Sequence, residues 1–425
     1  MRLLYDLFFL MFGLMYLPYL FAKGKMHRGF SQKFGFIPSE VKNLKKPVWI
    51  YAVSVGEAVL AAKLAAGIKK RFGNIPIAVS TTTRTGSDMI KSFGKGSVDA
   101  VFYYPMDLSF VVSRAVGAID PRAYIMIETE LWPNLLNELH SKNIPVILAN
   151  GRISDSSFTR YARIKFVMRR VLRCIDRFCM QSEKDAERIE QLGALPQRVF
   201  VTGNMKFDGQ EESCENRFAK ESLGFERDDD IVVAGSTHAP ECIIMLDIYK
   251  KLRKDHRSGL KLILAPRHVE RVDALKGYIK RSGLDYRQFS HVLKDEASFH
   301  RRCDVLLVDT IGHLRELYSV ATAVFIGGSL TSRGGQNPIE AARWGKPVIF
   351  GPRMSNFRAI SEIFLENEAA VRVKDAGGLE KALKSLLQNP SQQERMAENA
   401  KRVIKNHAGA VAKTVEGLEE YVGDA

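Results

Sequence analysis

The sequence contains few cysteines and no paired cysteine motif. Five cysteines occur in 425 residues, at positions 174, 179, 214, 242 and 303, and no two of them are spaced as C-x-x-C. An odd number of thiols without such spacing argues against a disulfide framework and against a structural zinc site. Reduced thiols are typical of the cytosol, so we expect the folded domains to face that compartment.

Several nucleotide- and nucleic-acid-binding signatures are also missing. The sequence contains neither G-x-G-x-x-G nor G-x-x-x-x-G-K-[ST], which disfavours a dinucleotide-binding enzyme and a phosphate-loop NTPase. The net charge of +15 predicts an anionic partner, which nucleic acid, phospholipid or a phosphorylated substrate would each satisfy. Because no arginine-rich run alternates with aromatic residues, we expect no nucleic-acid partner.

The N-terminus begins with an apolar run. Residues 7–22 carry no charge, and as a helix they span about 24 Å, less than the roughly 30 Å of a bilayer's hydrocarbon core. No small-x-small cleavage site follows, so a signal peptide fits poorly. The next stretch is basic, with Lys23, Lys25, Arg28 and Lys33, and the positive-inside rule places everything after it in the cytoplasm. We therefore predict that residues 1–30 form a membrane-anchor helix with a basic flank, spanning once or lying in the interface. A buried core helix is the alternative.

The rest of the chain alternates short apolar strands with helices, the pattern of a parallel sheet covered on both faces. The alternation stops in the polar segment 210–230 and then starts again, which indicates two domains. We predict an α/β protein with two Rossmann-like, doubly wound domains, at 31–210 and 211–425, facing a central cleft. A helical tail is expected over 379–421. Its terminal helix either stays with the second domain or packs back on the N-terminal domain. Ligands of such sheets bind beyond the carboxyl ends of the strands.

Charged residues at strand ends of the first domain are candidates for chemistry. Ser54-x-x-Glu57 opens a helix and is either a capping box or the site of a carboxylate general base, and the residues alone favour neither. Glu128 ends another strand and suits a binding site better than Glu130, which lies nearer the next helix start. Lys206 follows the last strand and can meet negative charge, although isolated lysines are more often simply solvated.

Two strand ends of the second domain are candidates for binding an anion or a nucleotide. Pro266 and Arg267 end one strand, and an arginine fork fits phosphate with two hydrogen bonds. Ile311, Gly312 and His313 follow another strand, and His313 is equally well explained as a surface residue.

The segment 333–340 holds the richest motif. Asn337 can cap a helix, Pro338 suits its first position, and Ile339 leads to Glu340 at the third position. Amides at such a helix start would hold an anionic phosphate. Glu340 would accept hydrogen bonds from ribose hydroxyls.

Eight motifs together resemble the 3-deoxy-D-manno-octulosonic acid (Kdo) transferases of lipopolysaccharide and lipid A biosynthesis. They occur in the family's order over nearly the whole chain, and together they are highly specific, although each is weak alone. The motifs are residues 52–57, 81–86, 128–134, 203–208, 265–268, 327–329, 333–340 and 355–358.

The resemblance implies a GT-B fold and an inverting, metal-independent glycosyltransferase that needs no cofactor. Its donor would be CMP-Kdo, and its acceptor would be lipid IVA, a phosphorylated and acylated glucosamine disaccharide. Glu57 would be the general base, while Glu128 and Lys206 would support the transition state. The CMP would be bound by residues 266–267, 311–313 and 337–340, although His313 departs from the acidic residue that is common there in the family.

An acceptor embedded in a bilayer would also account for the basic regions. The anchor and its flank would hold the enzyme against anionic phospholipid on the cytoplasmic side of a bacterial inner membrane. A second basic region would contact acceptor or lipid phosphates, or is a solvated helix face. It consists of Arg152, Arg160, Arg163, Lys165, Arg169 and Arg170. Two other functions stay open: another nucleotide-sugar enzyme of the same fold, such as an epimerase, and a non-catalytic basic membrane-binding scaffold.

Overall fold

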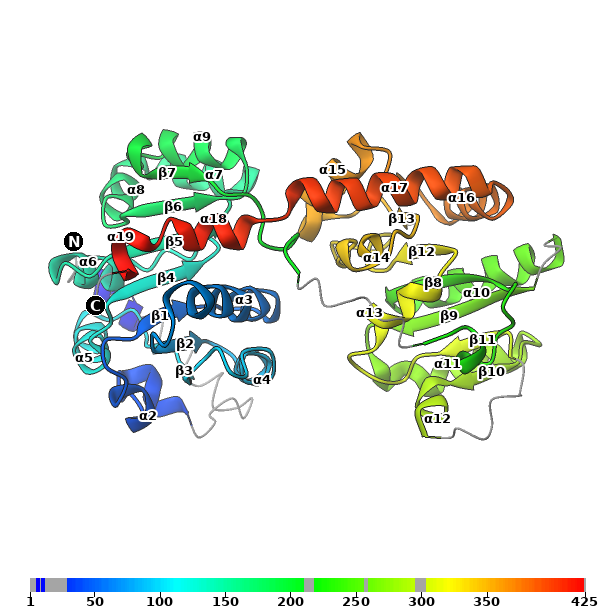
Figure 1. The fold of residues 1–425 in the computed structure, drawn as a ribbon, viewed down its shortest axis with the longest axis horizontal. Helices are drawn as coiled ribbons and strands as arrows, with labels where there is room; N and C mark the ends of the chain where they lie inside the picture. Colours follow the sequence, from blue (N-terminus) through cyan, green and yellow to red (C-terminus); the bar gives the residue numbers. More distant parts are fainter. Residues whose placement is uncertain are drawn as a thin grey trace. The chain divides into compact units, whose positions relative to one another are not determined.

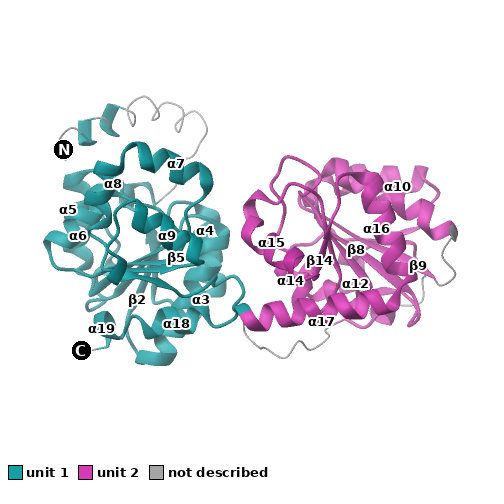
Figure 2. Cartoon of the chain, turned by 90° about the horizontal axis from the view of Figure 1, so that it is seen from above, with its two compact units in different colours: residues 1–208, 407–425 teal, residues 209–406 magenta. Residues whose placement is uncertain are grey.

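The computed structural model (Figure 1) describes residues 5–7, 9–11, 29–209, 218–255, 259–294 and 303–423. Most of the predicted anchor, residues 12–28, and the first part of the predicted linker lie outside the described residues. Within the described part, no helix is both long enough and apolar enough to cross a membrane. The chain divides into two compact units (Figure 2): unit 1 contains Met1–Asp208 and His407–Ala425, and unit 2 contains Gly209–Asn406.

Unit 1 is built on a seven-stranded parallel sheet in the order β3-β2-β1-β4-β5-β6-β7. The strands are β1 (Val48–Tyr51), β2 (Ile77–Thr81), β3 (Ala100–Tyr103), β4 (Ala123–Ile127), β5 (Val146–Gly151), β6 (Arg177–Met180) and β7 (Val199–Val201). Every residue of β1, β2, β4 and β5 is buried. This explains their continuous apolar runs, because a parallel sheet covered on both faces has no side that faces solvent.

Helices connect these strands. They are α2 (Ser39–Lys42), α3 (Val55–Phe72), α4 (Arg84–Phe93), α5 (Ser109–Ile119), α6 (Pro133–Ser141), α7 (Asp155–Arg163), α8 (Lys165–Leu172) and α9 (Glu183–Gln191), preceded by the 3-10 helix η1 (Phe30–Phe34). Hydroxyl side chains start four of them: Ser54, Thr83, Ser154 and Ser182 each accept a hydrogen bond from a backbone N–H three residues later. Such caps satisfy donors that have no partner inside the helix.

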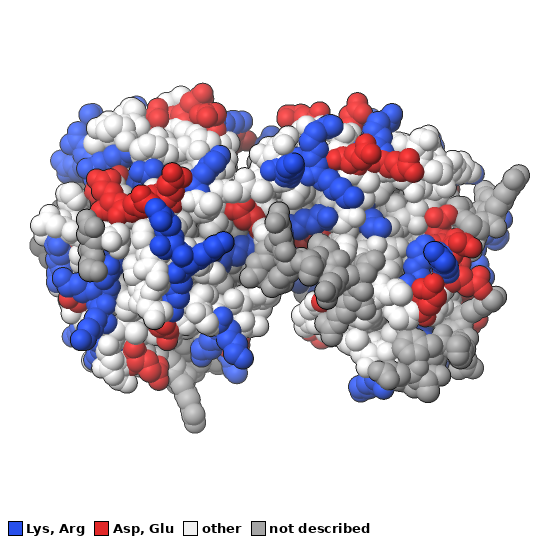
Figure 3. Space-filling model, in the orientation of Figure 1, with Lys and Arg blue, Asp and Glu red and all other residues white. Residues whose placement is uncertain are grey.

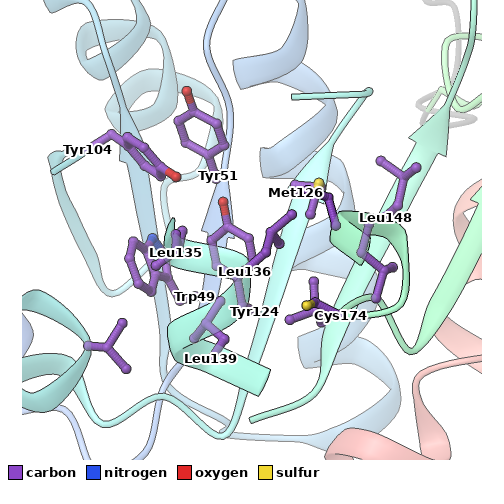
Figure 4. Close-up of a cluster of buried hydrophobic side chains, with 14 of the residues drawn as sticks. Trp49, Tyr51, Tyr104, Tyr124, Met126, Leu135, Leu136, Leu139, Leu148 and Cys174 are labelled. Carbon is purple, nitrogen blue, oxygen red and sulfur yellow. The ribbon is translucent and has the colours of Figure 1, made fainter. Parts of the chain in front are cut away.

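Successive residues of β1 point to opposite faces of the sheet, and each face has its own core. Trp49 and Tyr51 pack on one face, while Val48 and Ile50 pack on the other. The first face carries a buried aromatic cluster with Tyr124 (Figure 4). Its rings meet closely, since Trp49 contacts Tyr124 edge-on with a centroid separation of 5.0 Å. The cluster holds the carboxyl ends of β1 and β4 on a rigid layer.

Unit 2 has a second seven-stranded parallel sheet, in the order β10-β11-β9-β8-β12-β13-β14. The strands are β8 (Asp230–Thr237), β9 (Leu260–Pro266), β10 (Tyr286–Gln288), β11 (Val305–Leu307), β12 (Ala323–Ile326), β13 (Val348–Phe350) and β14 (Ala370–Arg372). Apolar runs in the sequence account for the five inner strands but not for β10 and β14. Both are edge strands of three residues, so neither has the apolar run that marks a strand buried on both sides.

The principal helices after β8 are α10 (Ala239–Asp255), α11 (Val272–Arg281), α12 (Phe289–Lys294), α13 (Leu314–Leu317), α14 (Ile339–Arg343), α15 (Arg358–Glu366), α16 (Ala376–Gln388), α17 (Pro390–His407), α18 (Ala410–Glu416) and α19 (Glu419–Val422). The prediction of one helical tail was wrong. Asn389 precedes a proline and leaves the helical region, with φ −130° and ψ 84°. Gly409 breaks the chain again with φ 99°, a conformation open to glycine.

The end of the chain returns to unit 1, where α18 packs on α3. A Cβ added at Gly67 of α3 would lie 3.0 Å from Val411 and 3.1 Å from Val415, so the glycine allows close contact between the helices. The Asp208 carboxylate accepts hydrogen bonds from the backbone N–H groups of Gly409 at 2.6 Å, Ala410 at 3.3 Å, and Val411. Asp208 therefore caps a helix that follows it by about 200 residues.

Replacing Asp208 by Ala should loosen the returning helix, because three backbone donors lose a charged acceptor. We expect the free energy of opening α18 to fall by about 1–3 kcal/mol. Hydrogen exchange of peptides covering residues 410–416, followed by mass spectrometry, measures this. Asp208→Asn keeps one acceptor oxygen and should lose less, and α16 serves as the internal control. Unchanged exchange in Asp208→Ala would show that the carboxylate does not hold the helix.

Candidate functional site

The strand order reverses between β1 and β4 in unit 1 and between β8 and β12 in unit 2. At such a reversal the connections leave neighbouring strands in opposite directions, and the crevice between them is where α/β sheets bind ligands. In unit 1, Glu57 follows β1 and Glu128 follows β4. In unit 2, His238 follows β8, and residues 327–329 follow β12. The two carboxylates predicted from the sequence thus flank the reversal of unit 1.

Glu57 forms the capping box that its sequence motif predicts. Its Oε1 accepts a hydrogen bond from the Ser54 hydroxyl at 2.7 Å, and its backbone N–H donates to Ser54 Oγ at 3.3 Å. Its Oε2 accepts from the backbone N–H of Val53 at 2.8 Å. The residue is 8% exposed. The capping role therefore fixes the carboxylate at the reversal in a single orientation.

The surroundings of Glu57 act on its proton affinity in opposite directions. Burial is the largest effect and raises the pKa above its usual value. Hydrogen bonds from Val53 and Ser54 to the charged form oppose this, while the negative charge of Glu128 adds to it. A carboxylate with a raised pKa is a stronger base than a solvated one, so this environment suits proton abstraction.

Glu128 lies between two cations. Its Oε1 is 3.0 Å from Lys206 Nζ, and its Oε2 is 3.4 Å from Arg152 Nε. Lys206 and Glu128 are both mostly buried, with side-chain exposures of 19% and 15%. Glu128 also has a positive φ of 59°, which is uncommon outside glycine and is often found where a side chain must be aimed at a functional site.

The backbone around Lys206 is held by a chain of amide side chains. Asn150 Oδ1 accepts from the backbone N–H of Met205 at 2.9 Å, and Asn204 Oδ1 accepts from that of Lys206 at 3.0 Å. The Asn204 amide in turn donates to Gln181 Oε1 at 3.0 Å. Lys206 is therefore a positioned residue, and the simpler explanation as a solvated lysine does not fit its burial.

The charge at the start of α6 comes from a residue that sequence reasoning missed. Asp107 is buried and accepts hydrogen bonds from the backbone N–H groups of Asn134 at 3.1 Å and Leu135 at 2.8 Å. Burial raises the pKa of Asp107 to about 6, against the opposing effect of these bonds. Glu130 does not reach the first turn. Its pKa is raised by burial and then by the charges of Glu57 and Glu128, which places Glu130 in the same acidic group.

The predicted residues of unit 2 follow neighbouring strands of its sheet. Pro266 ends β9, and the backbone N–H of Arg267 donates to Thr237 O at the end of β8, at 2.8 Å. Ile311 is 83% exposed. His313 precedes α13, and its Nδ1 lies 3.7 Å from a carboxylate oxygen of Glu316.

The predicted cap at residues 337–340 is present, but the helix begins one residue later than predicted, at Ile339. Asn337 Oδ1 accepts from the backbone N–H of Ile339 at 3.1 Å, and its amide donates to Glu340 Oε1 at 3.2 Å. Pro338 precedes the helix, so the prediction that it occupies the first helical position was wrong. The helix, α14, has five residues, and the backbone N–H of its first residue, Ile339, donates to the Asn337 side chain.

Glu241 is a second residue that the sequence motifs did not single out. It is fully buried, and its carboxylate accepts hydrogen bonds from the backbone N–H groups of His238 at 2.8 Å, Gly328 at 2.7 Å and Leu330 at 3.0 Å. Glu241 therefore ties the loop after β8 to the loop after β12. The spacing His238-x-x-Glu241, which parallels Ser54-x-x-Glu57, was the signal available in the sequence.

The second basic region lies on α7, α8 and the turn between them. We call Arg160, Arg163, Lys165, Arg169 and Arg170, with Ile164 and Phe166, the α7–α8 surface. Ile164 and Phe166 are 50% and 68% exposed, and the Arg170 guanidinium lies 4.5 Å from the Phe166 ring centroid. Arg152, which the sequence placed in this region, pairs with Glu128 instead. On the face of unit 1 drawn in Figure 3, Lys and Arg are interspersed with groups of Asp and Glu.

The chain matches known proteins over most of its length. Residues 28–209 match the family model for 3-deoxy-D-manno-octulosonic-acid transferase (kdotransferase). A 3-deoxy-D-manno-octulosonic acid transferase of Haemophilus influenzae is 30% identical over 398 residues, covering 92% of this chain and 91% of that protein. One from Bordetella pertussis is 31% identical, covering 89% and 88%. The chain belongs to the 3-deoxy-D-manno-octulosonic acid transferase family.

The Kdo transferase family resemblance inferred from the motifs is thus confirmed. A bifunctional glycosyltransferase/methyltransferase of Fusobacterium nucleatum is 34% identical over 88% of this chain, and the chain spans 57% of that relative's length. The matched segment 28–209 contains Glu57, Glu128 and Lys206.

Solved structures of similar fold support the two-domain α/β architecture. A UDP-N-acetylglucosamine 2-epimerase has a TM-score of 0.61 at 14% identity, covering 90% of this chain and 98% of that one. A UDP-GlcNAc 2-epimerase from Neisseria meningitidis has a TM-score of 0.59 at 13% identity, covering 88% and 100%. At these identities the likeness establishes two parallel-sheet α/β domains. Among the described residues, no three His, Cys, Asp or Glu side chains are grouped as a metal site, and metal independence stays a prediction.

Replacing Ser54 by Ala should alter Glu57 in two measurable ways. The start of α3 loses its cap, so the free energy of unfolding should fall by about 1 kcal/mol. The carboxylate loses a hydrogen bond that favours its charged form, so the pKa of Glu57 should rise further. Urea unfolding and carboxyl-carbon NMR titration measure the two effects. Thr83→Ala, which removes the equivalent cap of α4, is the control that should leave the Glu57 titration unchanged.

Proposed function

We propose that the protein is an inverting, metal-independent glycosyltransferase that moves Kdo from CMP-Kdo to lipid IVA. Membership of the Kdo transferase family supports Kdo transfer. The observation that carries the chemistry is the arrangement at the β1–β4 reversal, where the buried carboxylate of Glu57 lies within electrostatic range of Glu128, which is paired with Lys206.

Glu57 is the general base in this proposal. It takes a proton from an acceptor hydroxyl while that oxygen attacks the anomeric carbon of Kdo. The bond from that carbon to the CMP phosphate breaks, CMP leaves from the opposite face, and the configuration inverts. The raised pKa favours this role, and the bonds from Val53 and Ser54 keep the carboxylate aimed.

The Glu128–Lys206 pair supports the transition state. Positive charge develops on the sugar ring as the bond to phosphate breaks, and a carboxylate at the reversal stabilises that charge. Lys206 holds Glu128 in place and offsets the repulsion between Glu128 and Glu57. The ion pair is partly buried, so solvent screens it less than a surface pair.

Unit 2 holds the CMP in this proposal. Arg267 and the end of β9 contact the phosphate, while residues 311–313 and 337–340 contact the nucleoside, with Glu340 accepting hydrogen bonds from ribose hydroxyls. His313 stands where the family commonly has an acidic residue. The nearby carboxylate of Glu316 supplies an acceptor at this strand end.

The acceptor places the enzyme at the cytoplasmic side of a bacterial inner membrane. Residues 1–30 serve as the anchor, spanning once or lying in the interface. The α7–α8 surface offers exposed Phe166 and Ile164 among cations, a combination that suits an anionic phospholipid surface or the acceptor's phosphates.

A nucleotide-sugar epimerase is the rival function, because epimerases share the fold. Incubation with CMP-Kdo and lipid IVA, with mass measurement of the lipid, separates the two. A transferase adds the mass of one or more Kdo residues to lipid IVA, whereas an epimerase leaves the lipid unchanged. An unmodified lipid would overturn the proposal.

Replacing Glu57 by Gln should lower the transfer rate by about 10²–10⁴-fold while leaving CMP-Kdo binding intact. The amide keeps the shape and one acceptor oxygen of the capping box, but it cannot accept a proton. Single-turnover assays measure transfer, and calorimetry measures donor binding. Ser54→Ala, which also weakens the cap but leaves the carboxylate, is the matched control and should keep most of the activity. Normal turnover in Glu57→Gln would exclude the residue as the base.

Reversing the charge of Arg163, Lys165 and Arg169 to Glu should weaken binding to anionic vesicles. Each cation near such a surface contributes about 1 kcal/mol, so the loss should be at least 100-fold. Cosedimentation with phosphatidylglycerol and phosphatidylcholine vesicles measures it. The same reversal at Lys374, Lys381 and Lys405, which are exposed in unit 2, is the control. Equal binding by both triple variants would show that the α7–α8 surface does not contact the membrane.

A further inference from the structure

His238 lies at the strand-order reversal of unit 2. It follows β8, which lies between β9 and β12 in the sheet. Neither the sequence motifs nor the proposed nucleotide contacts assign it a role. Because ligands of these sheets bind at the reversal, a side chain there is better placed for a ligand than one at the end of an outer strand.

Basic groups that follow two other strands act on His238. The charges of Arg267 and His268, after β9, and of Arg333, after β12, act on its ring. The ring of His268 lies 5.7 Å away, centroid to centroid, in an edge-on arrangement. A cluster of this kind, drawn from separate loops, is positioned to surround an anion.

The carboxylate of Glu241, beside this cluster, already accepts hydrogen bonds from the backbone. Glu241 also acts on His238 through its charge. However, Oε2 of Glu241 accepts from the backbone N–H groups of His238 and Gly328, and Oε1 accepts from that of Leu330. Glu241 therefore fixes the backbone on both sides of the reversal and contributes no hydrogen bond to the His238 ring.

The Nε2 atom of His238 is buried and hydrogen-bonds to no residue that the structure describes. The ring lies against the loop after β12, since a Cβ added at Gly328 would be 3.5 Å from His238 Cδ2 and 3.5 Å from the Gln336 amide nitrogen. Buried polar atoms in folded proteins nearly always have a partner. A buried imidazole nitrogen without a described partner, in a ring next to basic side chains at a ligand-binding edge, thus indicates a ligand atom that accepts a hydrogen bond.

The surroundings also determine the charge of the ring. Burial lowers the pKa of His238, Glu241 opposes this effect, and Arg333, His268 and Arg267 lower the pKa further. The ring is therefore neutral near pH 7, with one nitrogen as donor and the other as acceptor. An anion bound in the cluster would offset the three basic neighbours and raise the pKa.

We infer that His238 donates a hydrogen bond from Nε2 to an oxygen of the donor's phosphate, which Arg267 and Arg333 bind from the flanking loops. The inference rests on the proposed function, since it takes the phosphate to be that of a cytidine nucleotide. It adds His238 and Arg333 to the phosphate contacts and gives Glu241 the role of positioning residue for both loops.

The test is calorimetric titration of CMP into the full chain near pH 6, in two buffers that differ in ionisation enthalpy. The wild type should bind more protons per CMP than the His238→Gln variant does, because binding raises the pKa of His238. The CMP phosphate, whose second pKa is about 6, contributes equally to both proteins, so the difference between them reports the histidine. His238→Gln keeps an N–H donor but cannot titrate. It should therefore lose less affinity for CMP than His238→Ala does, and it should lack the proton uptake by His238. His238→Ala should lose about tenfold or more in affinity.

The matched control is His291→Gln, an exposed histidine of α12 whose replacement should change neither affinity nor proton uptake. If His238→Ala proves unstable by circular dichroism, His238→Gln still carries the test through proton uptake. Proton uptake and affinity equal to wild type in the His238→Gln variant would overturn the inference. Absence of CMP binding by the wild-type chain would instead overturn the proposed donor.

Discussion

Burial of β1 and β4 on both faces is the constraint on which the candidate site of unit 1 depends. Every residue of these neighbouring strands is buried, so charged side chains are excluded until the chain leaves the sheet. Both strands run in the same direction, and their polar continuations therefore emerge at one edge. Glu57 follows the first strand and Glu128 follows the second, which brings two carboxylates together from positions 71 residues apart in the sequence. The ion pair with Lys206 then makes that proximity tolerable, because two buried like charges would otherwise repel each other.

In unit 2, too, side chains emerge at one edge of the sheet beyond two neighbouring strands, but there they are basic rather than acidic. There β8 and β12 are the neighbours at the reversal, and the side chains beyond the sheet edge are largely basic: His238, His268, Arg267 and Arg333. A single buried carboxylate, Glu241, joins the two loops through backbone amides rather than through side-chain cations. Unit 1 thus presents carboxylates, which suit a base and a developing positive charge, whereas unit 2 presents a cationic edge, which suits a phosphate. This division matches the two partners that a sugar transfer needs.

Backbone hydrogen bonds give the buried acids their place. Glu57, Asp107 and Glu241 each accept from backbone N–H groups near a helix start or strand end, where the donors have no partner within the element. Burial raises the pKa of Glu57 and of Asp107, and the accepted hydrogen bonds limit that rise. The Glu57 carboxylate, held in this way, stabilises the local backbone and also has a raised pKa, which suits a base. For this reason the capping box and the general base, which stood as alternatives for Glu57, are compatible roles.

The sequence by itself determined the features that depend on near neighbours along the chain. These include the alternation of buried strands and helices, the capping box of Ser54 and Glu57, and the position of Glu57 and Glu128 at strand ends, since each depends on contacts within about one helical turn. The family also followed from the motifs. Only the tertiary structure decided that Asp208 caps α18, that Asp107 serves α6, that Glu241 bridges two loops and that Arg152 pairs with Glu128. These partners lie tens to hundreds of residues apart. What brings them together is the order of strands in the sheet and, for Asp208, the return of the chain's end to unit 1. That order depends on how all the strands bury one another, and no local pattern of residues encodes it.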